Sequence, residues 1–185
     1  GDKKYVKRLL LFAVLSEIPF NLAMGSSVFF PIHQNVLWSF LISIGLIHLN
    51  EKARKTGKLW IRIATGCGTV LFGYLIGILT MVDFYHAGIL TVLAFYFFRN
   101  RKWWGYIGQL VCLWYINTEI LGGFGYEISL FGSTYFFTRQ GLALLALIPI
   151  WLYKGRQGLH NKPLQYFYYA FYPVHLLILG LLKML

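Results

Sequence analysis

Charged residues are scarce in this sequence, at 12% of 185 residues, whereas a soluble domain carries about 25%. Acidic residues are the scarcest, since six of them stand against 17 basic ones and the formal net charge is +11. Hydrophobic residues make up 58% and aromatic residues 19%, which is typical of membrane proteins with aromatic side chains at both interfaces. The composition therefore predicts an all-α fold, a polytopic transmembrane helix bundle that forms a single domain over residues 1–185.

The sequence also has few cysteines and no visible internal repeat. The two cysteines, Cys67 and Cys112, both lie inside apolar segments, so we expect neither a disulfide nor a metal site. The sequence has no visible internal repeat, which weighs against a transporter built from two repeated halves. A net charge this positive would suggest nucleic acid as the partner of a soluble protein. Here the basic residues stand between apolar runs, so membrane topology explains them and no nucleic-acid partner is expected.

Seven apolar segments can be drawn, and we interpret each as a membrane segment, although the second and fourth are short for a span. Their limits are 6–24, 36–50, 59–80, 84–98, 103–121, 137–153 and 165–183. Fourteen of the 17 basic residues fall at the start of the chain or in every second connection; the exceptions are Arg62, Arg139 and Lys183. Positively charged connections stay in the cytoplasm. The prediction is a multi-pass protein of the cell membrane, with the N-terminus cytoplasmic, the C-terminus extracytoplasmic and the lipid bilayer as a partner.

Most polar side chains fall in the outer half of this arrangement. Glu17 lies deep in the first segment, where an ionisable group is costly and often functional, and it shares a helix face with Asn21 four residues later. Arg139 is either a partner of Glu17 or a marker of the outer interface. The remaining polar residues at outer segment ends are His33, Gln34, Asn35, Asp83, His86, Asn117, Glu119 and Gln140.

Several of these residues also have an ordinary structural interpretation. Asp83 suits the N-cap of the segment that follows it, and His33 and His86 are typical polar loop residues. Pro19 and Pro173 should each kink the helix that contains them. His175 follows Pro173 near the middle of the last segment, QYFYYAFYPVHLLILGLL (165–182). It is either part of a polar interior or a structural histidine bonded to a backbone carbonyl, and both interpretations stay open.

Four stretches resemble the TraX family of polytopic bacterial membrane proteins, which is named for the enzyme that N-acetylates conjugative pilin. They are RLLLFAVLSEIPFNLA (8–23), HQN (33–35), DFYHAGIL (83–90) and YFYYAFYPVHLLIL (166–179), and they bracket nearly the whole chain. The resemblance implies an acyltransferase of the bacterial inner membrane that uses acetyl-CoA as the acyl donor. Family members usually begin with two further helices, the first with an Asp-His pair, so we expect this chain to be a fragment. If that pair is catalytic, activity belongs to the longer parent protein.

The resulting hypothesis is acetyl transfer from acetyl-CoA to an extracytoplasmic or membrane-associated peptide, sugar or lipid. Such a reaction needs a general base and groups that stabilise an oxyanion. The candidate catalytic residues are His175 as the base with Asp83 and Glu17. The candidate acceptor-binding residues are Asn21, Asn35, His86, Arg139, Gln140 and Tyr172, and Arg8 and Arg62 are the candidates for the phosphates of the donor. The alternatives are a transporter or channel-like protein with a polar intramembrane cavity, and a scaffold whose polar residues only fix helix packing.

Overall fold

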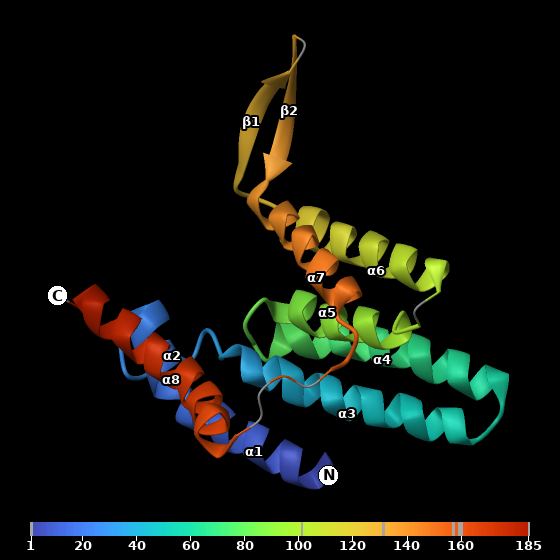
Figure 1. The fold of residues 1–185 in the computed structure, drawn as a ribbon, viewed down its shortest axis with the longest axis horizontal. Helices are drawn as coiled ribbons and strands as arrows, with labels where there is room; N and C mark the ends of the chain where they lie inside the picture. The colour runs from blue at the N-terminus through green and yellow to red at the C-terminus, as the bar shows by residue number, and fades with distance from the viewer. Residues whose placement is uncertain (1, 101, 131, 157, 159–160, 185) are drawn as a thin grey trace. The chain divides into compact units, whose positions relative to one another are not determined.

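The computed structural model describes the chain except for residues 1, 101, 131, 157, 159–160 and 185 (Figure 1). It is mostly helical, with one pair of strands. In chain order the elements are α1 (Asp2–Leu15), α2 (Glu17–Gly25), α3 (Val36–Lys55), α4 (Leu59–Leu79), α5 (Tyr85–Phe97), α6 (Trp103–Tyr115), the π-helix η1 (Ile116–Ile120), β1 (Gly125–Leu130), β2 (Ser133–Thr138), the 3-10 helix η2 (Arg139–Ala146), α7 (Leu147–Leu152) and α8 (Lys162–Met184).

Helices occupy all seven predicted apolar segments, but the prediction of seven spans is not confirmed. Among the described residues, α4 and α8 are long and apolar enough to cross a membrane, and the bent pair α1–α2 makes a third candidate if it counts as one span. Helix α5 has 13 residues, roughly 20 Å of helix, which falls short of a hydrocarbon core about 30 Å thick. The chain is therefore a mostly helical membrane protein with two or three candidate spans.

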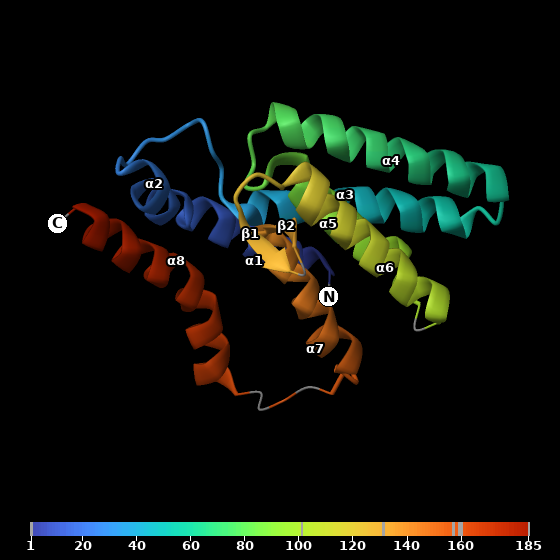
Figure 2. The same cartoon turned by 90° about the horizontal axis from the view of Figure 1, so that it is seen from above.

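Pro19 and Pro173, the two prolines expected to kink their helices, act differently. Pro19 is the third residue of α2, and the chain bends by 41° between α1 and α2. Proline removes a backbone donor and clashes with the carbonyl four residues earlier, here that of Leu15, the last residue of α1. The predicted kink at Pro19 is thus confirmed as a helix break. Pro173 lies inside α8, which continues past it as one helix, and Figure 2 shows that α8 changes direction part-way along its length.

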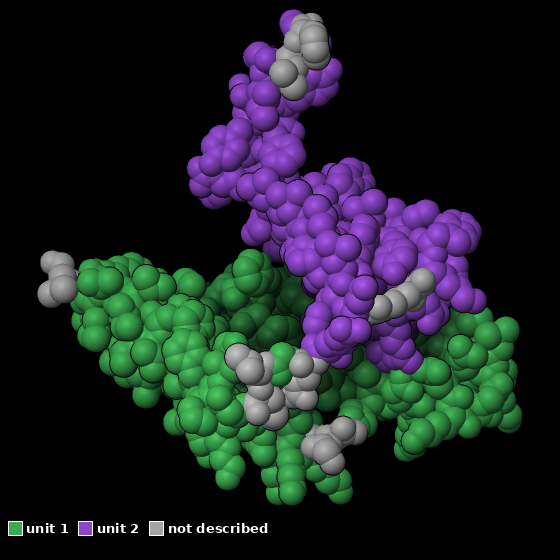
Figure 3. All heavy atoms as spheres, viewed as in Figure 1, with its two compact units in different colours: residues 1–89, 157–185 green, residues 90–156 purple. Residues whose placement is uncertain are grey.

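The chain divides into two compact units, residues 1–89 with 157–185 and residues 90–156, coloured green and purple in Figure 3. In the first unit α2 packs on α8 and α3 packs on α4. Gly73 and Gly77 of α4 are buried, and a Cβ on Gly77 would stand 2.5 Å from the Cα of His86. The four-residue spacing of small residues therefore serves close packing, as its pattern predicts.

Helices α1–α2 and α8 run in the same direction within this unit. Near their starts Arg8 Nη1 donates a hydrogen bond to the Tyr169 hydroxyl, 3.3 Å away. Near their ends Lys183 Nζ donates to the carbonyls of Ala23 and Met24, at 3.3 and 2.9 Å. Their starts thus share one side of the unit.

The second unit contains a feature that the sequence analysis missed. Residues 122–136 were expected to be an outer loop, yet β1 and β2 pair as an antiparallel hairpin, with Tyr126 opposite Phe137 and Ile128 opposite Tyr135. Aromatic and β-branched residues favour strands, and Gly132 supplies a positive φ of 81° in the connection. The remainder of the unit packs α6, η2 and α7 around Ala94, Leu113 and Leu147.

Candidate functional site

Two connections of the first unit meet before α3 and after α4. The backbone N–H of Gln34 donates to the Met81 carbonyl at 2.9 Å, and that of Asp83 donates to the Gln34 carbonyl at 2.7 Å. Gln34 and Val82 thereby form a short parallel bridge. We call residues 31–35 with 81–85 the loop crossing. It fixes the backbone on either side of two titratable side chains.

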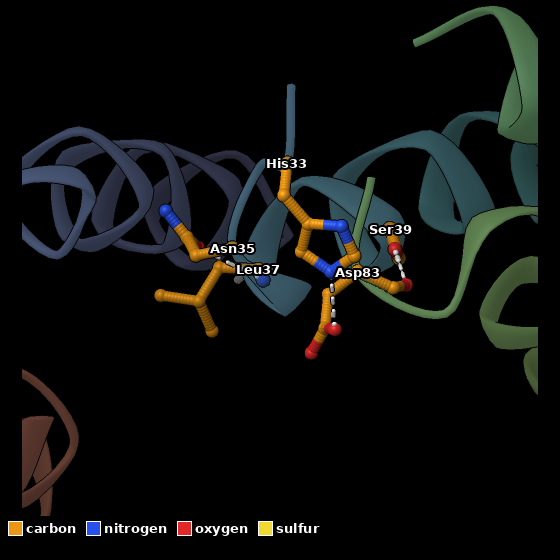
Figure 4. Close-up of polar contacts among 5 residues, drawn as sticks. All are labelled: His33, Asn35, Leu37, Ser39 and Asp83. Carbon is orange, nitrogen blue, oxygen red and sulfur yellow. Dashed lines mark hydrogen bonds and ion pairs between the residues drawn. The ribbon is translucent and has the colours of Figure 1, made fainter. Parts of the chain in front are cut away.

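These side chains are His33 and Asp83, shown in Figure 4. His33 Nε2 lies 3.0 Å from Asp83 Oδ1, and the two side chains are 24% and 19% exposed. Phe20 stacks on the imidazole and Tyr85 meets it edge-on, which holds the ring plane. An Nε2–H that donates to a carboxylate leaves the lone pair on Nδ1. The pair is thus oriented, partly exposed and suited to proton transfer.

The backbone around Asp83 adopts conformations that L-residues rarely occupy. Met81, Phe84 and Tyr85 have positive φ angles of 50°, 58° and 47°. Each such conformation costs about 1–3 kcal/mol and persists where surrounding structure imposes it, most often at functional sites. Helix α5 begins at Tyr85, and the partner of the Asp83 side chain is His33. The interpretation of Asp83 as an N-cap is therefore not supported.

Glu17 lies in a second polar group at the start of α2. Its Oε2 accepts hydrogen bonds from Trp38 Nε1 at 3.0 Å and from Asn35 Nδ2. Asn35 is fully buried; its Nδ2 also donates to the Ala13 carbonyl at 2.8 Å, and its Oδ1 caps α3 through the N–H of Leu37. The same amide thus ties together α1, α2 and α3. The partners of Glu17 come from α3, so the predicted partner Arg139 is not needed to explain it.

Three buried side-chain oxygens lie close together in sequence, on residues 16–21. Among the described residues, Ser16 Oγ, Glu17 Oε1 and Asn21 Oδ1 are buried and have no hydrogen-bond partner. Glu17 and Asn21 share a face of α2 as predicted, and Asn21 Nδ2 donates to the Val28 carbonyl at 3.1 Å. Buried polar atoms are costly without a partner. These three oxygens can therefore accept hydrogen bonds from a bound group.

His175 is held by its own helix. Its Nδ1 lies 2.8 Å from the Phe171 carbonyl, and its ring stacks on Phe171 and meets Tyr172 edge-on. Nδ1 therefore donates, and Nε2 carries the lone pair. Pro173 frees the carbonyl of Tyr169, whereas His175 bonds to that of Phe171. This contact is the one expected of a structural histidine. Tyr172 itself is close enough to Asp83 and Glu17 to interact with their charges.

The other predicted site residues are spread over both units. His86 packs against Tyr74 at 4.5 Å between ring centroids, and its Nδ1 is buried without a partner among the described residues. Arg8 lies on α1 and Arg62 near the start of α4, and both are exposed. In the second unit, the Arg139 guanidinium lies 5.0 Å from the centre of the Tyr126 ring, and Gln140 follows it in η2.

Sequence reasoning missed His33 and Trp38 as site residues. His33 was interpreted as a polar loop residue, although the predicted topology already placed it on the same side as Asp83. Trp38 has no sequence signal of its own, because an interfacial tryptophan is ordinary in a membrane protein.

Comparison with known families gives one match. The family model described as "TraX protein" matches residues 1–183, nearly the whole chain. No curated protein and no solved structure matches it.

Proposed function

Because the chain belongs to the TraX family, we propose that it is a membrane-embedded acyltransferase with its acid–base centre at the loop crossing. The acyl group would be acetyl, taken from acetyl-CoA and passed to an amine or hydroxyl of an extracytoplasmic or membrane-associated acceptor. The observation that carries the proposal is the 3.0 Å contact between His33 and Asp83, made between two connections and set in a backbone with three positive φ angles.

In this reaction the two residues transfer one proton from the acceptor to the leaving group. His33 Nδ1 removes the proton from the acceptor N–H or O–H as the acceptor atom attacks the thioester carbonyl. The tetrahedral intermediate then collapses, the C–S bond breaks, and the proton passes to the departing thiolate of CoA. Asp83 stabilises the imidazolium that forms between these steps. A positioned general base of this kind contributes about 10²–10⁴-fold to a rate.

Glu17 and Asn21 would hold the acceptor. Their unpartnered oxygens can accept hydrogen bonds from an amine or hydroxyl, while Asn35 and Trp38 keep Glu17 oriented. Tyr172 approaches this group from α8. A preorganised set of buried acceptors fixes the nucleophile near the reacting carbonyl, which is the main benefit of orientation in a bimolecular reaction.

Arg8 is the better placed of the two candidates for the donor phosphates. It precedes Ala13, which is bonded to Asn35, by five residues, or roughly 7.5 Å along the helix. Arg62 lies at the opposite end of α4 from the loop crossing. We propose that the donor binds from the cytoplasmic side, with the N-terminus on that side and the C-terminus on the other. The parallel course of α1–α2 and α8 and the basic connections support this orientation.

The test is acetyl transfer by the protein in membrane vesicles, with radiolabelled acetyl-CoA and counting of membrane-associated product. His33→Ala should lower kcat by about 10²–10⁴-fold. His48→Ala is the matched control, because His48 is an exposed α3 residue whose Nδ1 contacts the Ile44 carbonyl of its own helix.

His175→Ala separates the two histidine assignments. Loss of transfer in His175→Ala with activity kept in His33→Ala would return the base to α8, as the sequence alone suggested. Full activity in both variants would remove imidazole catalysis from the proposal altogether.

Transport is the second candidate, and the α1–α2 break favours it. Broken helices with unpartnered oxygens are typical of substrate sites in transporters, and Ser16, Glu17 and Asn21 provide such a group. Flux of a small polar solute into proteoliposomes in the absence of any acyl donor would support transport. Dependence of every activity on acetyl-CoA would exclude it.

A further inference from the structure

The hairpin of the second unit has one apolar face that is about half exposed. Side chains alternate between the two faces of a strand pair, so the register places Tyr126, Ile128, Tyr135 and Phe137 on the same face. These four side chains are between 43% and 59% exposed. Glu127, Ser129 and Thr134 lie on the opposite face with Phe136.

An isolated two-stranded hairpin is only marginally stable in water. Both of its outer edges offer unpaired backbone groups, and exposed apolar strands of this kind readily associate with other surfaces. A hairpin with this composition therefore needs a surface that covers its aromatic face and leaves its polar face wet.

The segments on either side of the hairpin indicate that this surface is the lipid bilayer. The hairpin follows α6 and η1 and precedes η2 and α7, and all of these are apolar segments of a membrane protein. Figures 1 and 2 agree that it turns across the direction of α6 rather than extending it. A hairpin that turns across an apolar helix in this way can lie along the bilayer surface. Tyrosine is enriched at that depth because its ring is apolar and its hydroxyl is polar.

The base of the hairpin carries a cation suited to lipid phosphate. The Arg139 backbone N–H donates to the Phe124 carbonyl at 3.0 Å, and its guanidinium lies 5.0 Å from the Tyr126 ring centre. Strands β1 and β2 contain no lysine or arginine, so Arg139 supplies the positive charge at this point. Its planar fork binds phosphate oxygens in pairs.

We propose that the hairpin, residues 124–130 and 132–139, forms an interfacial anchor on the bilayer surface where η1 ends. The face formed by Tyr126, Ile128, Tyr135 and Phe137 inserts among the lipid headgroups, and Arg139 binds lipid phosphate. Amphipathic segments of this kind reach about 5–10 Å into the boundary between headgroups and acyl chains. The anchor sets the level of the second unit in the membrane and does not depend on the enzymatic proposal.

The experiment compares two adjacent positions on opposite faces. In a Cys67→Ala, Cys112→Ala background, Ile128→Cys and Ser129→Cys are each labelled with an environment-sensitive fluorophore. The chain is then reconstituted into phosphatidylcholine–phosphatidylglycerol vesicles that contain a headgroup-level nitroxide lipid. Quenching by the nitroxide should be several-fold stronger at position 128 than at position 129, and emission at 128 should shift to the blue.

Equal and weak nitroxide quenching at both positions, with strong quenching by aqueous iodide, would overturn the proposal. Efficient disulfide cross-linking through position 128 without nitroxide quenching would instead assign the face to a second copy of the chain. If the position 128 variant does not fold, Tyr135→Cys with its neighbour Thr134→Cys gives the same comparison on β2. An Arg139→Gln variant should lose part of the nitroxide quenching at 128.

Discussion

The loop crossing and helix α8 each present a histidine, and the two imidazoles are held in different ways. His33 bonds to Asp83, a carboxylate 50 residues away on another connection. His175 bonds to a carbonyl one turn back in its own helix. A carboxylate partner both orients the ring and stabilises its charged form, whereas a carbonyl within the same helix only orients it. The role of a histidine therefore depends less on how deep it lies in an apolar segment than on which group its ring bonds to.

The largest expected effect comes from removing that partner. Asp83→Asn keeps the size of the side chain but cannot stabilise an imidazolium with a negative charge, so acetyl transfer should fall by about 10²-fold. Glu51→Gln is the matched control, because Glu51 makes an exposed ion pair with Arg54 at 3.0 Å. The measurement is kcat of the protein in membrane vesicles. An Asp83→Asn variant as active as Glu51→Gln would show that the carboxylate is not part of the mechanism.

The next largest effect is expected where α4 packs against the start of α5. A Cβ at Gly77 would stand 2.5 Å from His86 Cα and 2.7 Å from its backbone nitrogen, so Gly77→Ala should push on the segment that carries Asp83. We expect a destabilisation of about 1–3 kcal/mol, read as a lower apparent Tm in detergent, together with lower activity.

Two further glycines complete that series. At Gly180 of α8 the nearest atoms are the Leu22 Cβ at 2.8 Å and backbone atoms of Leu22 and Ala23 at 3.0 Å. These contacts are longer than those at Gly77, so Gly180→Ala should lower the apparent Tm less than Gly77→Ala. Gly68 has nothing within 4 Å of its Cβ position, so Gly68→Ala should be neutral or stabilising by up to about 1 kcal/mol. The same Tm for Gly68→Ala and Gly77→Ala would refute the close approach of α4 to α5.

The smallest expected effect concerns the contact between the end of α8 and the end of α2. Lys183 donates to the carbonyls of Ala23 and Met24 near the end of α2, where a positive charge is favourable by about 0.3–1 kcal/mol. Lys183→Met should lower the apparent Tm accordingly, with little change in acetyl transfer. Lys162→Met, at the opposite end of α8, should leave the Tm unchanged. A larger loss from Lys162→Met would contradict the parallel arrangement of α2 and α8.

The candidate site was partly visible in the sequence. Glu17 and Asn21 were placed on one helix face by their spacing, and Asp83 and Asn35 were assigned to the same side by the alternation of basic connections. The choice of His33 over His175 as the partner of Asp83 was not visible. It depends on the backbone bridge between Gln34 and Val82, and no local pattern encodes the distance between residues so far apart.

The sequence by itself determined where the helices lie, because apolar runs and prolines act locally: each of the seven segments contains a helix, and the chain breaks ahead of Pro19. It also carried the family resemblance. Only the tertiary structure decided that residues 125–130 pair with residues 133–138 as strands, that Glu17 is held by Trp38, and that Asp83 meets His33. Those contacts depend on which elements pack together, and the free energy that selects them belongs to the folded chain as a whole rather than to any one segment.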